Sequence, residues 1–184
     1  MRTQKSLTLL ALLAMGTSGA VFSDERSYPL DRWASRAKTG VTPVANPTYQ
    51  QECGSCHFPY QPGLLPAYAW EQIMGALSNH YGDNAELSPA DTQGIRNYLL
   101  NNAAGRTHSS TSKRFTHTGR TNGLPRISTT PYFIKKHDEI PARMVSSNKQ
   151  VRSFSHCNAC HTRAAEGSFR EDEVVIPGVG RWED

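Results

Sequence analysis

The run CGSCH at residues 53–57 recurs as CNACH at residues 157–161, and these two runs contain all four cysteines of the chain. C-x-x-C-H is the attachment signature of c-type haem, in which both thiols bond to the porphyrin and the histidine binds the iron. Two copies therefore predict two covalent haems. The predicted attachment residues are Cys53, Cys56, Cys157 and Cys160, and the predicted proximal iron ligands are His57 and His161.

Two other uses of C-x-x-C pairs are zinc binding and thiol redox chemistry, and neither requires a histidine directly after the second cysteine. The pairs of a four-cysteine zinc site also stand roughly 15–20 residues apart. Here 100 residues lie between Cys56 and Cys157. The spacing favours haem over a structural zinc module.

The first residues predict export from the cytoplasm. Arg2 and Lys5 precede an apolar run at residues 7–15 (LTLLALLAM), and a stretch of small residues follows at 16–20. This order is typical of a cleaved secretory signal peptide, and the apolar run is too short for a stable membrane span. We expect a signal peptide at residues 1–23 and a periplasmic mature protein, with an uncleaved anchor as the alternative.

The length, composition and charge of the chain say less about its function. The chain has 184 residues, 37% of them hydrophobic, and a net charge of +4. Removal of Arg2 and Lys5 with the signal peptide leaves 18 Lys and Arg against 16 Asp and Glu, a net charge of +2. The apparent basicity is therefore no argument for nucleic-acid binding, and two buried porphyrins would supply apolar surface that the sequence lacks.

Residues 48–105 are expected to form a first haem lobe. After a proline-rich loop, apolar residues from Trp70 to Tyr81 follow a helical period that ends at Gly82, and His80 lies on its apolar face. A second helix is expected to start at Ser88-Pro89 and to close at Gly105. The predicted fold is mainly α-helical with extensive loops, and this lobe resembles a class I cytochrome c.

The rest of the chain is expected to form a second haem lobe at residues 124–184, after a basic polar linker at 106–123. Thr130 and Pro131 predict the start of a short helix that Pro141 ends, with His137 on its apolar face. Residues 174–176 are expected to form a short extended segment against the second haem. Residues 24–47 form an N-terminal extension.

The sixth ligand of each iron decides between a carrier and a catalyst. His80 and His137 are the predicted distal ligands, since an unpartnered imidazole on an apolar face would cost free energy. Five other residues are weaker candidates. Met74 is expected to pack in the core, and Met144 lies in a short loop. His108 and His117 lie in the polar linker, and His156 is adjacent to an attachment cysteine.

Three blocks of the chain resemble the periplasmic dihaem cytochrome c family. They are ECGSCHFPYQPGLLPAYAWEQIMGALSNHYGDNAELSPADTQGIRNYLLNNAA, RISTTPYFIKKHDEIP and CNACHTRAAEGSFREDEVVIP. The resemblance implies low-potential haems with two histidine ligands each, and it places His80 and His137 at the distal positions. It also implies electron shuttling between a membrane-bound b-type cytochrome and a small oxygen-binding monohaem cytochrome c.

Two functions therefore compete. The first is a non-catalytic electron carrier with two covalent, low-spin haems c. The alternative is a dihaem enzyme, a peroxidase or haem reductase, in which one iron has an open or displaceable sixth ligand. The sequence supplies two distal histidines and no evident catalytic constellation, which favours the carrier.

Overall fold

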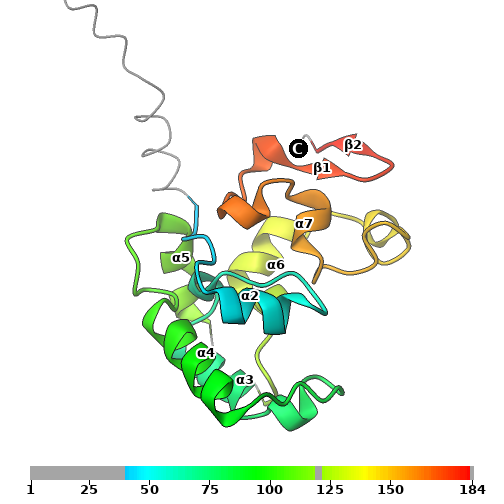
Figure 1. Ribbon diagram of the computed structural model, residues 1–184. Coiled ribbons are helices and arrows are strands. Elements are labelled where there is room, and N and C mark those ends of the chain that lie inside the picture. Colours follow the sequence, from blue (N-terminus) through cyan, green and yellow to red (C-terminus); the bar gives the residue numbers. More distant parts are fainter. Residues whose placement is uncertain (1–39, 119–121, 183–184) are drawn as a thin grey trace, which may run out of the picture.

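The computed structural model describes residues 40–118 and 122–182 of the chain. The predicted signal peptide at residues 1–23 lies outside the described residues, as does most of the N-terminal extension. Short helices and loops dominate, as predicted, and the two described stretches form two halves, which we call the N-terminal and C-terminal halves (Figure 1). Within these two stretches, no helix is long and apolar enough to cross a membrane.

Three helices build the N-terminal half: α2 (Pro47–Gly54), α3 (Ala67–Met74) and α4 (Pro89–Asn101). The predicted cap of α4 is confirmed, because the Ser88 hydroxyl accepts a hydrogen bond from the Asp91 amide at 3.1 Å. Helices α3 and α4 pack closely through buried apolar side chains. These include Trp70, Ile73, Ile95 and Leu99.

The prediction of one helix extending to Tyr81 is wrong. Helix α3 ends at Met74, and a separate 3-10 helix spans Leu77–Asn79. Gly75 terminates α3, and glycine is among the residues least favourable to a helix interior. His80 therefore lies in the turn after the 3-10 helix, where its backbone pairs with Asp83 at 2.7 Å.

The stretch expected to be a polar linker or surface loop contains a helix, α5 (Ser110–Arg114). The Ser109 hydroxyl accepts a hydrogen bond from the Ser112 amide at 3.0 Å and so caps α5. Phe115 follows and is buried against Tyr132. The few apolar residues of this stretch thus hold it against the C-terminal half, a long-range contact that local composition does not reveal.

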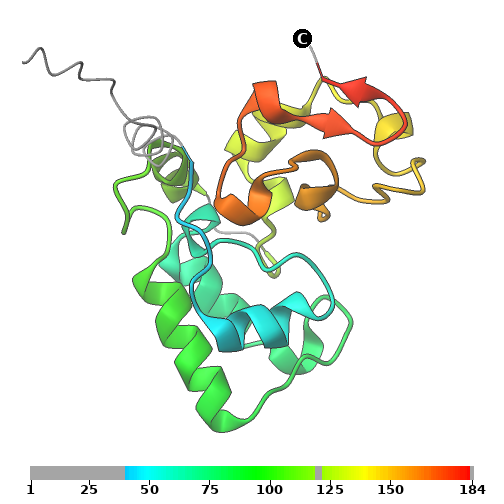
Figure 2. The same ribbon diagram turned by 45° about the horizontal axis from the view of Figure 1, so that its top comes forward.

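The C-terminal half contains α6 (Pro131–His137), α7 (Cys157–Cys160) and two short strands, β1 (Val175–Ile176) and β2 (Gly180–Arg181) (Figure 2). The strands pair antiparallel. The predicted cap of α6 is confirmed by the bond from the Phe133 amide to the Thr130 hydroxyl at 3.3 Å. Other 3-10 helices in the described residues are Pro62–Leu64, Phe115–His117, Ile127–Thr129, Ala142–Met144, Ala164–Glu166 and Glu171–Glu173.

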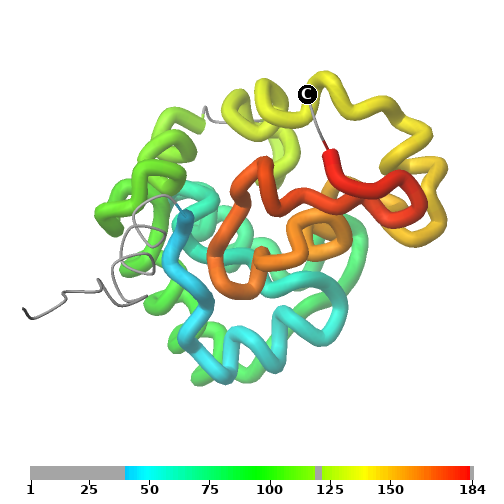
Figure 3. The backbone as a smooth tube through the Cα atoms, turned by 90° about the horizontal axis from the view of Figure 1, so that it is seen from above, coloured from blue at the N-terminus to red at the C-terminus, as the bar shows by residue number. Residues whose placement is uncertain are grey.

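The two halves are joined by contacts between segments far apart in sequence. The beginning of the described chain lies beside the C-terminal half, where the Val41 amide donates to the Gly167 carbonyl at 2.9 Å (Figure 3). Gln61 is fully buried and its amide donates to the Ala164 carbonyl at 2.5 Å. These contacts hold the two C-x-x-C-H segments in one structure.

Candidate haem sites

The first C-x-x-C-H run borders a cavity of about 800 Å³, which we call the first cavity. Helix α2 contains Cys53 and ends at Gly54, so the chain turns into the cavity wall at Cys56 and His57. His80 enters from the turn after the 3-10 helix. Apolar residues that complete the wall include Leu65, Trp70, Ile73, Met74, Leu77 and Leu99.

The rings of His57 and His80 face each other across the first cavity. Their centroids lie 6.2 Å apart and their planes differ by 17°. The Nδ1 of His57 is 2.8 Å from the Phe58 carbonyl oxygen, and a hydrogen bond there leaves Nε2 free to bind a metal. The predicted proximal and distal residues are thus brought together.

The second C-x-x-C-H run borders a second cavity of about 500 Å³. The short helix α7 places Cys157 and Cys160 at its wall, and His161 follows directly. His137 reaches the same cavity from the last position of α6. The extended segment at Val174 and Ile176 covers the cavity as the sequence predicts.

His137 and His161 form the second facing pair. Their ring centroids are 6.0 Å apart, but the planes differ by 70°. The Nδ1 of His137 lies 2.8 Å from the Phe133 carbonyl, one helical turn back. Both cavities therefore contain one histidine whose ring is fixed by a backbone carbonyl and a second that faces it.

The geometry of both pairs fits an iron ion held between two imidazoles. Two metal–imidazole bonds of about 2 Å, with about 1 Å from each nitrogen to its ring centre, require a centroid separation of about 6 Å. Each cavity is also within the range of about 300–1,000 Å³ usual for ligand pockets, with cysteine sulfur at its wall. Among the described residues, the buried Nδ1 atoms of His80 and His161 have no hydrogen-bond partner.

Burial favours the neutral form of His80, His137 and His161 and the uncharged form of the Cys53 and Cys157 thiols. Burial, followed by the neighbouring His137, lowers the pKa of His161 to about 4, and burial also lowers the pKa of His80 and of His137. A neutral imidazole is the form that binds metal. Burial raises the pKa of the Cys53 thiol to about 11 and that of Cys157 to about 12, surroundings that suit an uncharged thioether.

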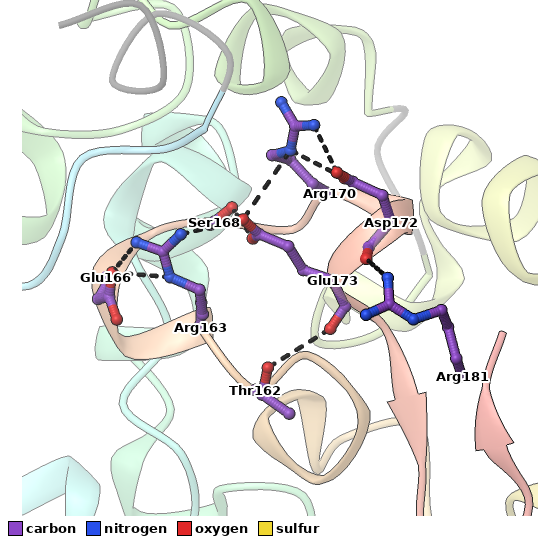
Figure 4. Close-up of polar contacts among 8 residues, drawn as sticks. All are labelled: Thr162, Arg163, Glu166, Ser168, Arg170, Asp172, Glu173 and Arg181. Atoms are coloured by element: carbon purple, nitrogen blue, oxygen red, sulfur yellow. Dashed lines mark hydrogen bonds and ion pairs between the residues drawn. The ribbon is translucent and has the colours of Figure 1, made fainter. Parts of the chain in front are cut away.

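A polar network braces the segment that follows His161 (Figure 4). Arg163 contacts Glu166 and also Glu173, the latter at 3.0 Å. The Ser168 hydroxyl donates to the same Glu173 carboxylate at 2.6 Å. Glu173 directly precedes Val174, whose backbone pairs with His161, so the network ties His161 to the C-terminal segment.

The weaker candidates occupy the places that the sequence suggests. Met74 is buried in the core beside the first cavity, while Met144 borders neither cavity. His108 and His117 are exposed. His156 borders the second cavity, with its Nδ1 2.8 Å from the Val151 carbonyl, but it directly precedes Cys157, which places it poorly as a distal ligand.

Sequence reasoning did not single out several residues that border the cavities, Tyr60, Phe154 and Arg126 among them. Tyr60 stacks on His57, Phe154 borders both cavities, and Arg126 reaches the first cavity from the C-terminal half. The aromatic residues stand three positions from a motif residue, a weak local signal. Arg126 has no such signal, because only the folded chain brings it to His80.

The family model and the solved structures that this chain matches are those of dihaem cytochromes c. A family model for dihaem cytochrome c matches residues 49–169. The structure is similar to that of a dihaem c-type cytochrome from Shewanella baltica OS155, with 45% identity, a TM-score of 0.63, and coverage of 75% of this chain and 98% of that one.

It is also similar to a dihaem cytochrome c from Rhodobacter sphaeroides, with 38% identity and a TM-score of 0.60. That match covers 71% of this chain and the whole of the other. A comparison with curated proteins gives no match.

Proposed function

The chain belongs to the dihaem cytochrome c family, and from that premise we propose that it carries electrons between redox partners in the periplasm. Two covalently bound haems c with their irons come with this family, and each supplies a one-electron Fe(III)/Fe(II) couple when bound. Membership of the family establishes a dihaem cytochrome. The iron ligands, the compartment and the redox partners are proposals.

Each iron is proposed to have two histidine ligands, His57 with His80 and His161 with His137. The observation that carries this assignment is the pair of ring separations, 6.2 Å and 6.0 Å, in two cavities that each border a C-x-x-C pair. The first-mentioned histidine of each pair follows its attachment cysteine directly. The second comes from another segment and closes the opposite side.

The protein's own residues hold the ligands in place and keep water away. The Phe58 and Phe133 carbonyls orient His57 and His137 through their Nδ1 atoms. Buried side chains such as Leu65 and Leu99 surround the first site, and Phe133 and Ile176 surround the second. Two ligands on each iron would leave no position for a substrate, which favours a carrier over a peroxidase or haem reductase.

The division into two lobes, the periplasmic location and the partners are also part of the proposal. We propose a first haem lobe at 48–105 and a second at 124–184, exported by the signal peptide at 1–23. The proposed partners are a membrane-bound b-type cytochrome and a small oxygen-binding monohaem cytochrome c. This pairing rests on the resemblance of the chain to its family.

Optical and EPR spectra of the purified holoprotein test the proposal, together with a pyridine haemochrome count of the haems. We expect two haems c that are low-spin in both the ferric and the ferrous state without added ligand. A high-spin ferric fraction that binds cyanide or carbon monoxide rapidly at neutral pH would contradict the carrier assignment for that haem. One haem instead of two would contradict the stoichiometry.

A further inference from the structure

Tyr60 borders the first cavity and bonds to the segment that precedes the second C-x-x-C-H run. Its ring stacks on His57, with centroids 4.9 Å apart and planes at 23°. Its hydroxyl donates a hydrogen bond of 2.8 Å to the carbonyl of Ser155, which is 95 residues away in the sequence. Ser155 stands two positions before Cys157, the first attachment residue of the second site.

The two cavities are separated by a single layer of side chains. Ile127, Phe154 and Cys157 border both cavities, and we call these three residues the shared wall. The ring of Phe154 meets that of His137 edge to face, with centroids 5.5 Å apart. The shared wall thus reaches the proposed distal ligand of the second site, while Tyr60 touches the proximal ligand of the first.

The environment of Tyr60 suits a fixed, neutral hydrogen-bond donor. Burial is the main cause that raises the pKa of Tyr60 to about 12, so the phenol keeps its proton. Its own carbonyl accepts a 2.8 Å bond from the hydroxyl of the buried Tyr49. Backbone, ring and hydroxyl are therefore each held by a different contact.

We propose that Tyr60 is a positioning residue that couples the two haems. It fixes the ring plane of His57 and holds the Phe154–Cys157 segment against the first cavity, and so sets the rate of electron exchange between the irons. One electron leaves one iron and arrives at the other, while the tyrosine is neither oxidised nor deprotonated. This inference rests on the proposed function.

The test compares Tyr60→Phe with Tyr68→Phe in the full holoprotein. Phenylalanine at 60 keeps the stacked ring and removes only the bond to Ser155. Tyr68 is a matched control, because its hydroxyl also donates to a distant backbone carbonyl, that of Thr118, yet it borders neither cavity. NMR exchange spectroscopy on half-reduced protein measures the intramolecular exchange rate.

We expect Tyr60→Phe to slow the exchange severalfold and to leave both haems low-spin, while Tyr68→Phe exchanges at the wild-type rate. Tyr60→Leu should also change the EPR signal of the haem bound by His57, because the stacked ring is lost. Equal exchange rates in Tyr60→Phe and Tyr68→Phe would overturn the inference, as would failure of Tyr60→Phe to incorporate both haems. High-spin wild-type protein would instead overturn the proposed function.

Discussion

The rings of Phe133 and His137 lie almost parallel, with centroids 3.8 Å apart and planes at 6°. The same two residues share a hydrogen bond, because the His137 Nδ1 is 2.8 Å from the Phe133 carbonyl. The i,i+4 spacing on α6 allows both contacts at once. The ring of His137 is therefore held by two contacts with Phe133 on its own helix.

The assignment of His80 and His137 as distal ligands is a proposal that substitution can test directly. His137→Ala should convert one haem to a high-spin form and leave the other low-spin, because alanine supplies no donor to the sixth position. His80→Ala should do the same to the other haem. The optical and EPR spectra of each variant, compared with wild type, measure the change.

His156→Ala is the control for these substitutions. His156 borders the second cavity, but it directly precedes the attachment residue Cys157 and is poorly placed as a distal ligand, so both haems should remain low-spin. If neither His80→Ala nor His137→Ala alters the spectrum, the ligand assignment is wrong. The exposed His108 and His117 would then be the next candidates.

The two haems should also differ in EPR spectrum. The imidazole planes are nearly parallel at the first site, at 17°, and steeply crossed at the second, at 70°. Crossed imidazoles leave the iron d orbitals closer in energy, which gives a more anisotropic low-spin signal. We expect one ordinary rhombic signal and one highly anisotropic signal, and two identical rhombic signals would contradict the ring angles.

Assigning the two signals requires one further variant. Phe133→Leu removes the ring stacked on His137 and leaves the first site untouched. The highly anisotropic signal should therefore shift in this variant, and the rhombic one should not. A shift of the rhombic signal alone would reverse the assignment.

Features set by neighbouring residues in the chain were predictable from the sequence. Ser88 and Thr130 cap their helices as predicted, because a cap needs only a hydroxyl and the amides that follow it. The short strand at Val175–Ile176 also follows from a local apolar run. By contrast, the prediction of a helix to Tyr81 is wrong. Helix α3 ends at Met74, and the prediction missed the break at Gly75 because the apolar period continues past it.

Contacts between distant segments could not be predicted. The bond from Tyr60 to Ser155 spans 95 residues, and nothing near Tyr60 in the sequence indicates its partner. The position of Arg126 beside the first cavity likewise depends on how the C-terminal half docks. The candidate ligands could be predicted from sequence motifs and helical periodicity, whereas the residues that contact them could be identified only from the folded structure.

Arg126 should raise the reduction potential of the first haem. Its guanidinium lies 4.1 Å from the centre of the ring of Tyr81, the residue directly after His80. Arg126 also borders the first cavity. A positive charge there stabilises the reduced iron, which carries one charge less. Arg126→Gln should therefore lower one midpoint potential and leave the other nearly unchanged in a redox titration.

Arg106→Gln is the matched control for Arg126→Gln. It makes the same change in net charge, and Arg106 is exposed like Arg126, but it borders neither cavity. Both potentials should then stay near their wild-type values. Equal shifts in the two variants would show that net charge, rather than the position of Arg126, sets the potential.

Gly167 should be intolerant of a side chain. Its φ is +78°, and an added Cβ would collide with the Val41 carbonyl oxygen at the junction of the two halves. Gly167→Ala should reduce the free energy of unfolding by about 1–3 kcal/mol or more, the usual cost of a left-handed conformation with a clash. Thermal or denaturant unfolding of the holoprotein measures the loss.

Gly94→Ala is the opposite case and serves as the control. Gly94 lies within α4, and an added Cβ there would meet nothing within 4 Å. Alanine should increase stability by about 0.5–1 kcal/mol, because glycine loses more backbone freedom on entering a helix. Similar destabilisation by both substitutions would argue against the described junction at Gly167.

Loss of one haem should affect the two sites unequally. The wall of the first cavity takes seven residues from the C-terminal half: Pro125, Arg126, Ile127, Ser128, Phe154, Ser155 and Cys157. The N-terminal half gives only Leu64, Thr111 and Phe115 to the second cavity. The first site therefore depends on the C-terminal half more than the second site depends on the N-terminal half.

Replacing Cys157 and Cys160 by Ala removes the second covalent haem and leaves its cavity of about 500 Å³ without its ligand. We expect the C-terminal half to become the first site of proteolysis, and the potential of the remaining haem to fall as water reaches it past Phe154. The converse variant, Cys53→Ala with Cys56→Ala, should change the potential of the second haem less. Limited proteolysis and redox titration of both variants measure this asymmetry, and equal potential shifts would contradict it.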